Sequence, residues 1–453
     1  MDSTIVAIST APGIGGIGII RMSGEECFNI LKKFFKPLND SDTIKGYTIK
    51  YGNIIDDNEV VDEVLVSYFK APKSYTKENM CEINSHGGTV IMNKILDLCI
   101  KNGAIIAEPG EFTKRAFLNG RIDLSQAEAV IDIINSKTDK EAKVSVDQLE
   151  GNLSNKIQKI RKMVISIMAD IEATIDYPEY DLEEVTNKRI LDVLNDVDKI
   201  LESLENSFYN GKILREGIMV AIVGRPNSGK SSLLNLLLNE ERAIVTDIEG
   251  TTRDTIEEFI SIEGVPLKII DTAGIRNAKD KVEQIGVEKA LEIAKKSDII
   301  IAIFDRNREL NEEDNKIIDL IKNKNAIVLL NKSDLESKID ISRFYGLKKK
   351  IIEISIKNQS GIDELYKAIS EMFKLKDIVS SGEVIVSNSR HKNIIVNSRE
   401  NLKMARETIN NNMPIDIIST YLKEILEELG KITGETVTDD VISEIFSKFC
   451  LGK

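Results

Sequence analysis

The spacing of hydrophobic residues changes along the chain and separates it into four stretches. Residues 1–120 combine short apolar runs, typical of strands, with two helical patterns and several glycine turns, which predicts an α+β domain. Within it we expect strands at 4–8, 18–22, 60–69 and 80–84 and helices at 25–35 and 89–101.

Residues 121–215 carry almost no glycine or proline, and their apolar positions recur at helical spacing. Residues 379–453 return to that spacing, with Pro414 separating two helical patterns. Since neither stretch alone looks large enough to bury its apolar stripes, we expect both to form one helical domain, into which residues 216–378 are inserted. The inserted stretch alternates strand and helix patterns, so the predicted fold is multidomain, α/β plus α, with a mostly parallel sheet between helices.

A glycine-rich motif opens the inserted stretch. Residues 224–231 read Gly-Arg-Pro-Asn-Ser-Gly-Lys-Ser and lie between a strand pattern at 218–223 and a helical pattern at 232–238. Backbone N–H groups at such a helix start cradle phosphates, a lysine reaches the terminal phosphates, and the following hydroxyl reaches Mg²⁺. The motif predicts a nucleoside triphosphate site formed by Asn227, Ser228, Gly229, Lys230, Ser231 and Ser232.

Three further motifs each follow a predicted strand. Asp271-Thr272-Ala273-Gly274 offers a carboxylate to the water shell of a metal ion and a glycine amide to the last phosphate. Asn331-Lys332-Ser333-Asp334 ends in a carboxylate that can accept two hydrogen bonds from the guanine edge, a pattern that adenine cannot offer. Ser355 is placed to close over the base. The order of these motifs predicts GTP as the nucleotide.

The residue after the Asp-Thr-Ala-Gly motif is Ile275, where regulatory GTPases usually carry a glutamine that orients water. An isoleucine cannot orient water. Either hydrolysis is very slow, or the polar group and the compensating positive charge come from elsewhere.

Composition narrows the class of protein. A chain of 453 residues has room for roughly three domains, and with 5% aromatic residues and no Trp its cores must be built from Ile, Leu and Val. No segment approaches the ~18 consecutive apolar residues that span a membrane, and no secretion signal opens the chain, so we expect a cytoplasmic protein. The four cysteines lack C-x-x-C spacing, which favours neither a disulfide framework nor a zinc site.

The formal net charge of −13 argues against broad, non-specific binding of nucleic acid. Local basic clusters exist, although runs like these are more often solvated helix faces than RNA sites. Any RNA contact is therefore expected to be local or shared with a partner. The clusters are Lys156, Lys159, Arg161 and Lys162; Lys348, Lys349 and Lys350; and Arg390, His391 and Lys392.

Several further segments resemble one known family. They are Thr-Asp-Ile-Glu-Gly-Thr-Thr-Arg-Asp at 246–254, Pro-Gly-Ile-Gly-Gly-Ile-Gly-Ile-Ile-Arg at 12–21, the segments 109–120 and 123–129, and the ending Phe-Cys-Leu-Gly-Lys at 449–453. Together with Gly-Arg-Pro-Asn at 224–227 they resemble the MnmE (TrmE) family of tRNA-modifying GTPases over nearly the whole chain.

This resemblance implies a mechanism for hydrolysis without the glutamine. A potassium ion beside the phosphates would supply the positive charge of an arginine finger, and a glutamate further along the second switch, Glu283, would orient water. The implied potassium ligands are Asn227, Thr246, Ile248 and Thr251, and the implied magnesium ligands are Ser231 and Thr252. Asp247, Glu249 and Gly250 complete the implied nucleotide contacts of the first switch.

The resemblance also implies a second chemistry in the N-terminal domain, where the family binds 5-formyl-tetrahydrofolate as a one-carbon donor. The matching positions are Arg21, Glu82, Arg121 and Lys453. The carboxylate would accept hydrogen bonds from the pterin edge, and the cations would face the glutamate tail. A free thiol at Cys450 near the folate fits a nucleophile, and it fits a buried C-terminal cysteine at least as well.

The function implied is GTP hydrolysis coupled to the addition of a carboxymethylaminomethyl group at C5 of the tRNA wobble uridine. Family members act as homodimers that form a heterotetramer with MnmG, a flavoprotein that carries the FAD. Two rivals stay open: a GTPase switch for ribosome assembly, and a folate-dependent aminomethyltransferase regulated by its GTPase domain. Dependence of tRNA modification on the flavin partner separates the three.

Overall fold

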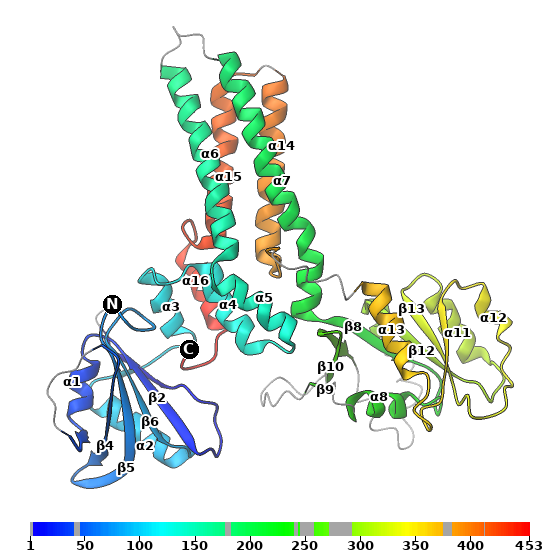
Figure 1. The fold of residues 1–453 in the computed structure, drawn as a ribbon, viewed down its shortest axis with the longest axis horizontal. Coiled ribbons are helices and arrows are strands. Elements are labelled where there is room, and N and C mark those ends of the chain that lie inside the picture. Colours follow the sequence, from blue (N-terminus) through cyan, green and yellow to red (C-terminus); the bar gives the residue numbers. More distant parts are fainter. Residues whose placement is uncertain are drawn as a thin grey trace. The chain divides into compact units, whose positions relative to one another are not determined.

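The computed structural model describes residues 3–39, 46–176, 183–239, 243–244, 258–270, 292–374, 383–411 and 413–453 (Figure 1). The chain divides into two compact units. The first contains residues 1–131, 148–197 and 397–453, and the second contains residues 132–147 and 198–396. The multidomain α/β plus α fold is confirmed, while the four predicted domain boundaries stay predictions.

A seven-stranded sheet forms the N-terminal part of the first unit, in the order β3-β4-β5-β6-β2-β1-β7. Neighbouring strands are antiparallel except for β1 and β7. The strands are β1 (Ile5–Ile8), β2 (Ile17–Ser23), β3 (Phe35–Pro37), β4 (Thr48–Asp56), β5 (Glu59–Phe69), β6 (Met80–His86) and β7 (Ile105–Ile106).

The two faces of this sheet differ. Helices α1 (Cys27–Lys32) and α2 (Thr89–Lys101) share one hydrophobic core with the inward residues of the strands, which alternate along each strand as the pleat requires. On the other face Ile49, Tyr51 and Leu65 are exposed, and Tyr51 pairs directly with Leu65 across β4 and β5. An apolar face of the sheet is therefore open in the single chain.

The predictions for this domain were mostly right. All four predicted strands are present, and α2 has the predicted bounds. The predicted helix at 25–35 was too long, because α1 ends at Lys32 and Phe35 begins β3. The strands β3, β4 and β7 were not predicted.

The helical part of the first unit contains α3 (Glu111–Leu118), α4 (Leu124–Asn135, to residue 131), α6 (Asn152–Asp176), α15 (Ile415–Thr433) and α16 (Asp439–Ser447). Three more helices belong to this unit only in part, within residues 148–197 and 397–453. They are α5 (Asp139–Leu149), α7 (Glu183–Glu216) and α14 (Ser389–Asn410). Polar contacts join α6, α7, α14 and α15 into a bundle (Figure 1). They are Arg189 with Asp170, Arg406 with the carbonyl of Leu194, and Arg161 with the carbonyl of Leu426.

The second unit is built on another seven-stranded sheet, in the order β14-β13-β12-β8-β11-β10-β9. The five strands from β14 to β11 are parallel, and β10 and β9 are added antiparallel. The strands are β8 (Ile218–Val223), β9 (Ala243–Ile244), β10 (Glu258–Ile262), β11 (Val265–Ile269), β12 (Ile299–Asp305), β13 (Ala326–Asn331) and β14 (Lys350–Ile354).

Helices cover both faces of this sheet (Figure 1). One core cluster contains residues of α8 (Lys230–Asn239) and α13 (Ile362–Phe373), and the other contains residues of α11 (Glu312–Ile321) and α12 (Ser342–Tyr345). Because the central strands are buried on both faces, they read as continuous apolar runs rather than alternating ones. The predicted mostly parallel sheet between helices is confirmed.

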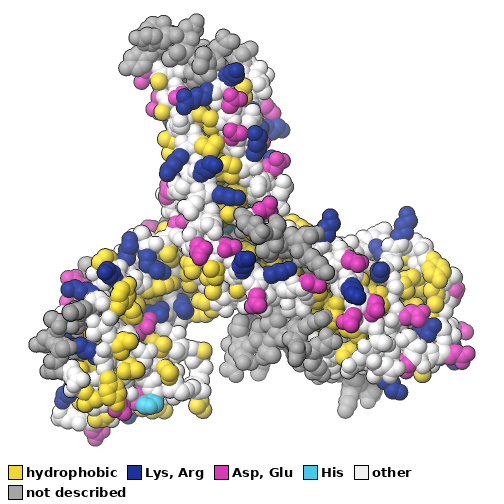
Figure 2. Space-filling view, viewed as in Figure 1, with side chains coloured by type: hydrophobic (Ala, Val, Ile, Leu, Met, Phe, Trp, Pro, Cys, Tyr) yellow, Lys and Arg dark blue, Asp and Glu magenta, His cyan; other side chains and the backbone are white. Residues whose placement is uncertain are grey.

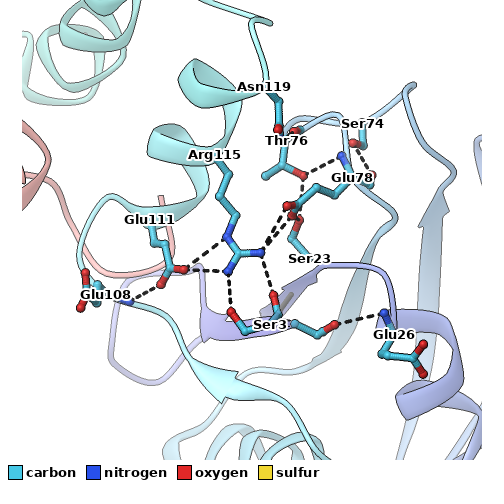
Figure 3. Close-up of polar contacts among 11 residues, drawn as sticks. Ser3, Ser23, Glu26, Ser74, Thr76, Glu78, Glu108, Glu111, Arg115 and Asn119 are labelled. Carbon is cyan, nitrogen blue, oxygen red and sulfur yellow. Dashed lines mark hydrogen bonds and ion pairs between the residues drawn. The ribbon is translucent and has the colours of Figure 1, made fainter. Parts of the chain in front are cut away.

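A buried arginine ties the N-terminal domain together (Figure 3). The side chain of Arg115 on α3 is only 1% exposed, and its Nη2 lies 2.8 Å from Oε1 of Glu111. Its Nη1 donates to the carbonyl of Ser3 at 2.8 Å and lies 3.2 Å from Oε2 of Glu78. The hydroxyl of Ser23 on β2 donates to the same Glu78 oxygen at 2.7 Å. One guanidinium thus connects the chain start, α3 and the loop that precedes β6.

We expect Arg115→Met to loosen this domain locally, because it leaves Glu78 and Glu111 largely buried without a cation. Breaking a buried ion pair on one side costs about 3 kcal/mol or more. Hydrogen exchange of the amides at 74–79 and 111–118 should accelerate accordingly. Lys114→Met on the same helix is the matched control and should leave these amides unchanged, and equal acceleration in both variants would contradict the assignment.

Candidate functional site

The glycine-rich loop connects β8 to α8 at the carboxyl edge of the parallel sheet. Gly224 lies so close to β12 that an added Cβ would be 2.5 Å from the carbonyl oxygen of Ile303. Asn227 has φ +63° and Gly229 has φ +109°, the left-handed region that turns backbone N–H groups inward. Lys230 begins α8, so Ser231 and Ser232 lie in its first turn. The loop and the first turn of α8 therefore place the N-terminal N–H groups of a helix at the carboxyl edge of the parallel sheet.

Charged side chains fix the two ends of this loop. The Nζ of Lys230 donates to the carbonyls of Gly224 and Arg225, both at 2.8 Å. Arg225 in turn lies 2.7 Å from Oδ2 of Asp314, the residue that caps α11 together with Asn311. The loop start is held on a helix end, and the lysine ammonium is held across the loop.

The second loop of the site follows β13, and the last residue of that strand, Asn331, binds the phosphate loop. Asn331 is 3% exposed, and its Nδ2 donates to the carbonyl of Ser228 at 2.8 Å. An added Cβ on Gly229 would lie 2.2 Å from that nitrogen, so only glycine fits there. The Nζ of Lys332 lies 2.6 Å from Oδ2 of Asp305 at the end of β12. The Asn331 side chain thus joins the two loops, and the Lys332–Asp305 ion pair holds the second loop on the end of β12.

Asp334 is exposed at the tip of this second loop. The hydroxyl of Ser355 donates to its Oδ1 at 2.6 Å, and this hydrogen bond, more than the nearby lysines, holds the pKa of the carboxyl below its usual range. The backbone N–H of Ser333 donates to the carbonyl of Ile354 at 3.0 Å. The structure thus presents an ionised carboxylate, held by its neighbour, beside the phosphate loop.

The described residues include the phosphate loop and the guanine-binding segments of the predicted nucleotide site. They do not include the two predicted switch segments. Residues 227–232, 331–334 and Ser355 lie together at one sheet edge, connected by the Asn331 amide. The remaining predicted positions lie outside the described residues. They are Thr246, Asp247, Ile248, Glu249, Gly250, Thr251, Thr252, Asp271, Thr272, Ala273, Gly274 and Glu283.

The predicted folate residues meet in the N-terminal domain. Arg21 on β2 and Glu82 on β6 are cross-strand partners, and both Nε and Nη2 of Arg21 contact the same carboxylate oxygen, Oε1, at 2.9 and 2.8 Å. The Nη1 of Arg21 donates to the carbonyl of Gly452 at 3.2 Å, which places the C-terminal segment at this pair. Burial, and then the charge of Arg21, lowers the pKa of Lys453.

An aromatic ring that the sequence did not single out lies among these charges. The guanidinium of Arg121 stacks 4.4 Å from the ring centre of Tyr75, and that of Arg21 lies 5.6 Å from it. The hydroxyl of Tyr75 shares a hydrogen bond of 2.9 Å with Thr113. A lone aromatic residue in the polar segment 70–79 was the only signal in the sequence.

Cys450 lies in the C-terminal segment, two residues before Gly452, and it is exposed. Of the two alternatives predicted for this residue, the buried cysteine was therefore wrong. Its carbonyl accepts a hydrogen bond from the N–H of Gly110 at 3.5 Å. The other three cysteines are buried.

Within the part of the chain that the structure describes, no helix combines the length and the apolar character needed to cross a membrane.

Comparison with known proteins covers the whole chain. A family model described as "GTP-binding protein TrmE N-terminus" matches residues 4–121, and one described as "MnmE helical domain" matches residues 124–450. The "tRNA modification GTPase MnmE" of Acetivibrio thermocellus is 49% identical over 456 residues, covering 100% of this chain and 99% of the relative. Those of Finegoldia magna and Clostridioides difficile are 49% and 48% identical, each with 100% of both chains covered. The chain belongs to the MnmE family of tRNA modification GTPases.

Proposed function

We propose that this chain hydrolyses GTP, in the cytoplasm, as the potassium-dependent component of the machinery that adds a carboxymethylaminomethyl group to C5 of the tRNA wobble uridine. GTP as the substrate is supported mainly by the hydrogen bond from the Asn331 side chain to the phosphate loop. This bond holds the loop beside the segment that presents Asp334, the proposed guanine-selective carboxylate. The tRNA reaction is supported by the relatives' name at 48–49% identity along the full length.

Each end of the nucleotide has a counterpart in the described residues. The Asp334 carboxylate, ionised and oriented by Ser355, accepts the two N–H groups of the guanine edge. At the other end, Lys230 and the N–H groups of the loop take the phosphates, and the Ser231 hydroxyl is an oxygen donor of the kind that Mg²⁺ prefers.

Hydrolysis depends on residues that bring charge and water to the last phosphate. The Asn227 carboxamide projects from the loop at a left-handed position, and its oxygen suits a large monovalent cation. Thr246, Ile248 and Thr251 supply the other oxygens of the potassium site, and Thr252 joins Ser231 on Mg²⁺. The cation, when bound, offsets negative charge that develops on the phosphates. Glu283 orients the attacking water in place of the glutamine that Ile275 replaces.

The N-terminal pocket takes 5-formyl-tetrahydrofolate. Both contacts of Arg21 use Oε1 of Glu82, which leaves Oε2 for the N–H groups of a pterin. Arg121 and Lys453 add positive charge for the glutamate tail, and Tyr75 offers a flat surface between the two guanidinium groups. Cys450 stands exposed beside this pocket as a candidate nucleophile.

The chain works as a homodimer that forms a heterotetramer with the flavoprotein MnmG, which carries the FAD. The dimer is supported by the open apolar face of the N-terminal sheet, where Ile49, Tyr51 and Leu65 are exposed (Figure 2). Exposed apolar faces of this kind mark protein contacts.

Mass spectrometry of wobble uridines tests the function. A strain that lacks this chain should lose the C5 modification, and so should a strain that lacks the flavoprotein. Modified uridines with normal abundance in the first strain would exclude the tRNA function. Loss in the first strain alone would favour an aminomethyltransferase that acts without the flavin partner, and a ribosome-assembly defect with intact uridines would favour the other rival.

Exchange of the monovalent cation tests the potassium site. We expect GTP turnover to be fast in K⁺ and slow in Na⁺, because the smaller ion cannot span the same oxygen ligands. Asn227→Ala should remove the difference while GTP binding persists. Asn235→Ala, on the exposed side of α8, is the matched control and should keep it. Equal wild-type rates in both salts would rule the site out.

Asp334→Asn tests guanine selectivity. The change removes two hydrogen bonds to a charged acceptor, each worth about 1.5–3 kcal/mol, so affinity for GTP should fall by ~10²-fold or more. Affinity for xanthosine triphosphate should rise, because the amide can donate to its C2 carbonyl. Asp340→Asn is the control, since that exposed carboxylate likewise accepts from a serine hydroxyl, Ser342, at 2.6 Å. Unchanged GTP affinity by calorimetry would contradict the assignment of Asp334.

A further inference from the structure

An open groove of about 500 Å³ lies between α6 and α7 in the first unit. Most of its lining comes from one side of α6, including Asn155, Lys159, Lys162 and Ser166, and Val193 of α7 completes it. Five of its seven lining residues carry amide, hydroxyl or ammonium groups, and Met163 and Val193 are apolar. Two ammonium groups in the lining distinguish this groove from a wholly apolar groove that would receive a helix of another protein.

The charge of this part of α6 is unusual for the chain. Residues 152–169 contain Lys156, Lys159, Arg161 and Lys162 and no acidic residue, whereas the whole chain has 74 acidic and 61 basic residues. Figure 2 shows both Lys or Arg and Asp or Glu side chains along the bundle, so the excess of positive charge belongs to this segment of α6 and not to the bundle as a whole. A local positive surface on a protein of net charge −13 directs a polyanion to one place, because the rest of the surface repels it on average.

Arg161 contacts another part of the protein, whereas Lys159 and Lys162 line the groove. The Nη2 of Arg161 lies 2.6 Å from Oε2 of Glu435, and Gln158 donates to the other oxygen of that carboxylate, so these two side chains fasten α6 to the segment after α15. Lys159 and Lys162 are exposed and make no ion pair among the described residues. Asp170, about one turn beyond Ser166 on α6, is paired with Arg189 at 3.0 Å. The free charge of the groove is therefore positive.

We propose that this groove binds the sugar–phosphate backbone of RNA, an assignment that rests on the proposed tRNA function and locates its contact on this chain. Lys159 and Lys162 are three residues apart on one side of α6, a helix rise of ~4.5 Å, and their long side chains bind successive phosphates. Asn155 and Ser166 offer an amide and a hydroxyl to ribose hydroxyl groups. The lining has no aromatic ring for a base to stack on, so the contact positions the RNA without reading its sequence.

Charge reversal in the full-length protein tests this. We expect Lys159→Glu with Lys162→Glu to weaken binding of an unmodified tRNA transcript by about tenfold or more, measured by fluorescence anisotropy. The slope of log affinity against log salt should become shallower by about 2, one for each phosphate that a lysine no longer neutralises. Lys159→Arg with Lys162→Arg should restore both values. GTP turnover without RNA should stay at the wild-type rate in every variant.

The matched control is Lys403→Glu with Lys423→Glu, which changes the net charge equally on α14 and α15 of the same bundle. An equal loss in this control would mean that total charge, and not the groove, governs binding, and would overturn the proposal. Unchanged tRNA affinity in the groove variant, with loss of flavoprotein binding, would assign the groove to a protein partner instead. If the wild-type protein bound no tRNA by itself, the groove proposal would fail, while the tRNA function would still be decided by the wobble uridines of the deletion strain. Melting curves followed by circular dichroism show whether the charge-reversal variant is folded. The neutral variant Lys159→Gln with Lys162→Gln removes the positive charges without adding negative ones, and it should also lose tRNA affinity.

Discussion

Parallel pairing of β8 with β12, and of β12 with β13, is the constraint on which the nucleotide site depends. Parallel strands end at the same edge of a sheet, so the loops after β8 and β13 meet although they are about a hundred residues apart in sequence. The Asn331 amide then fixes their separation through the Ser228 carbonyl. The relative position of the phosphate loop and of the segment that carries Asp334 is thereby fixed by one buried side chain, and Gly229 leaves the space that it needs.

The two candidate sites use charge in opposite ways. In the nucleotide site the carboxylate of Asp334 is exposed and is oriented by the Ser355 hydroxyl, and it forms no ion pair among the residues that the structure describes. In the N-terminal pocket the Glu82 carboxylate is already paired with Arg21, and only one of its oxygens is engaged. A ligand there joins an existing ion pair, which costs less desolvation than burying a lone charge.

Local signals explain which parts of the sites could be predicted from sequence. The loop 224–231 is one strand, one turn and one helix start, so its residues alone specify its geometry. The pocket around Tyr75 has no such signal, because it forms from Arg21, Arg121 and the C-terminal segment, which meet only through long-range pairing. The family resemblance supplied four of its charged residues and missed the ring. The helix α1 was predicted too long because Phe34 and Phe35 continue its apolar pattern while β3 pairs with β4.

The hydrogen bonds to Gly452 and Lys453 also have a consequence for biosynthesis. Arg21 and Ser9 donate to the Gly452 carbonyl, and the Phe112 N–H donates to that of Lys453 at 3.2 Å. Domains generally fold in order as the ribosome delivers them, N-terminal first. Here Ser9 and Arg21 cannot make these hydrogen bonds until more than 400 residues beyond them have been made. A nascent chain can therefore carry a finished nucleotide loop while its N-terminal pocket is still open.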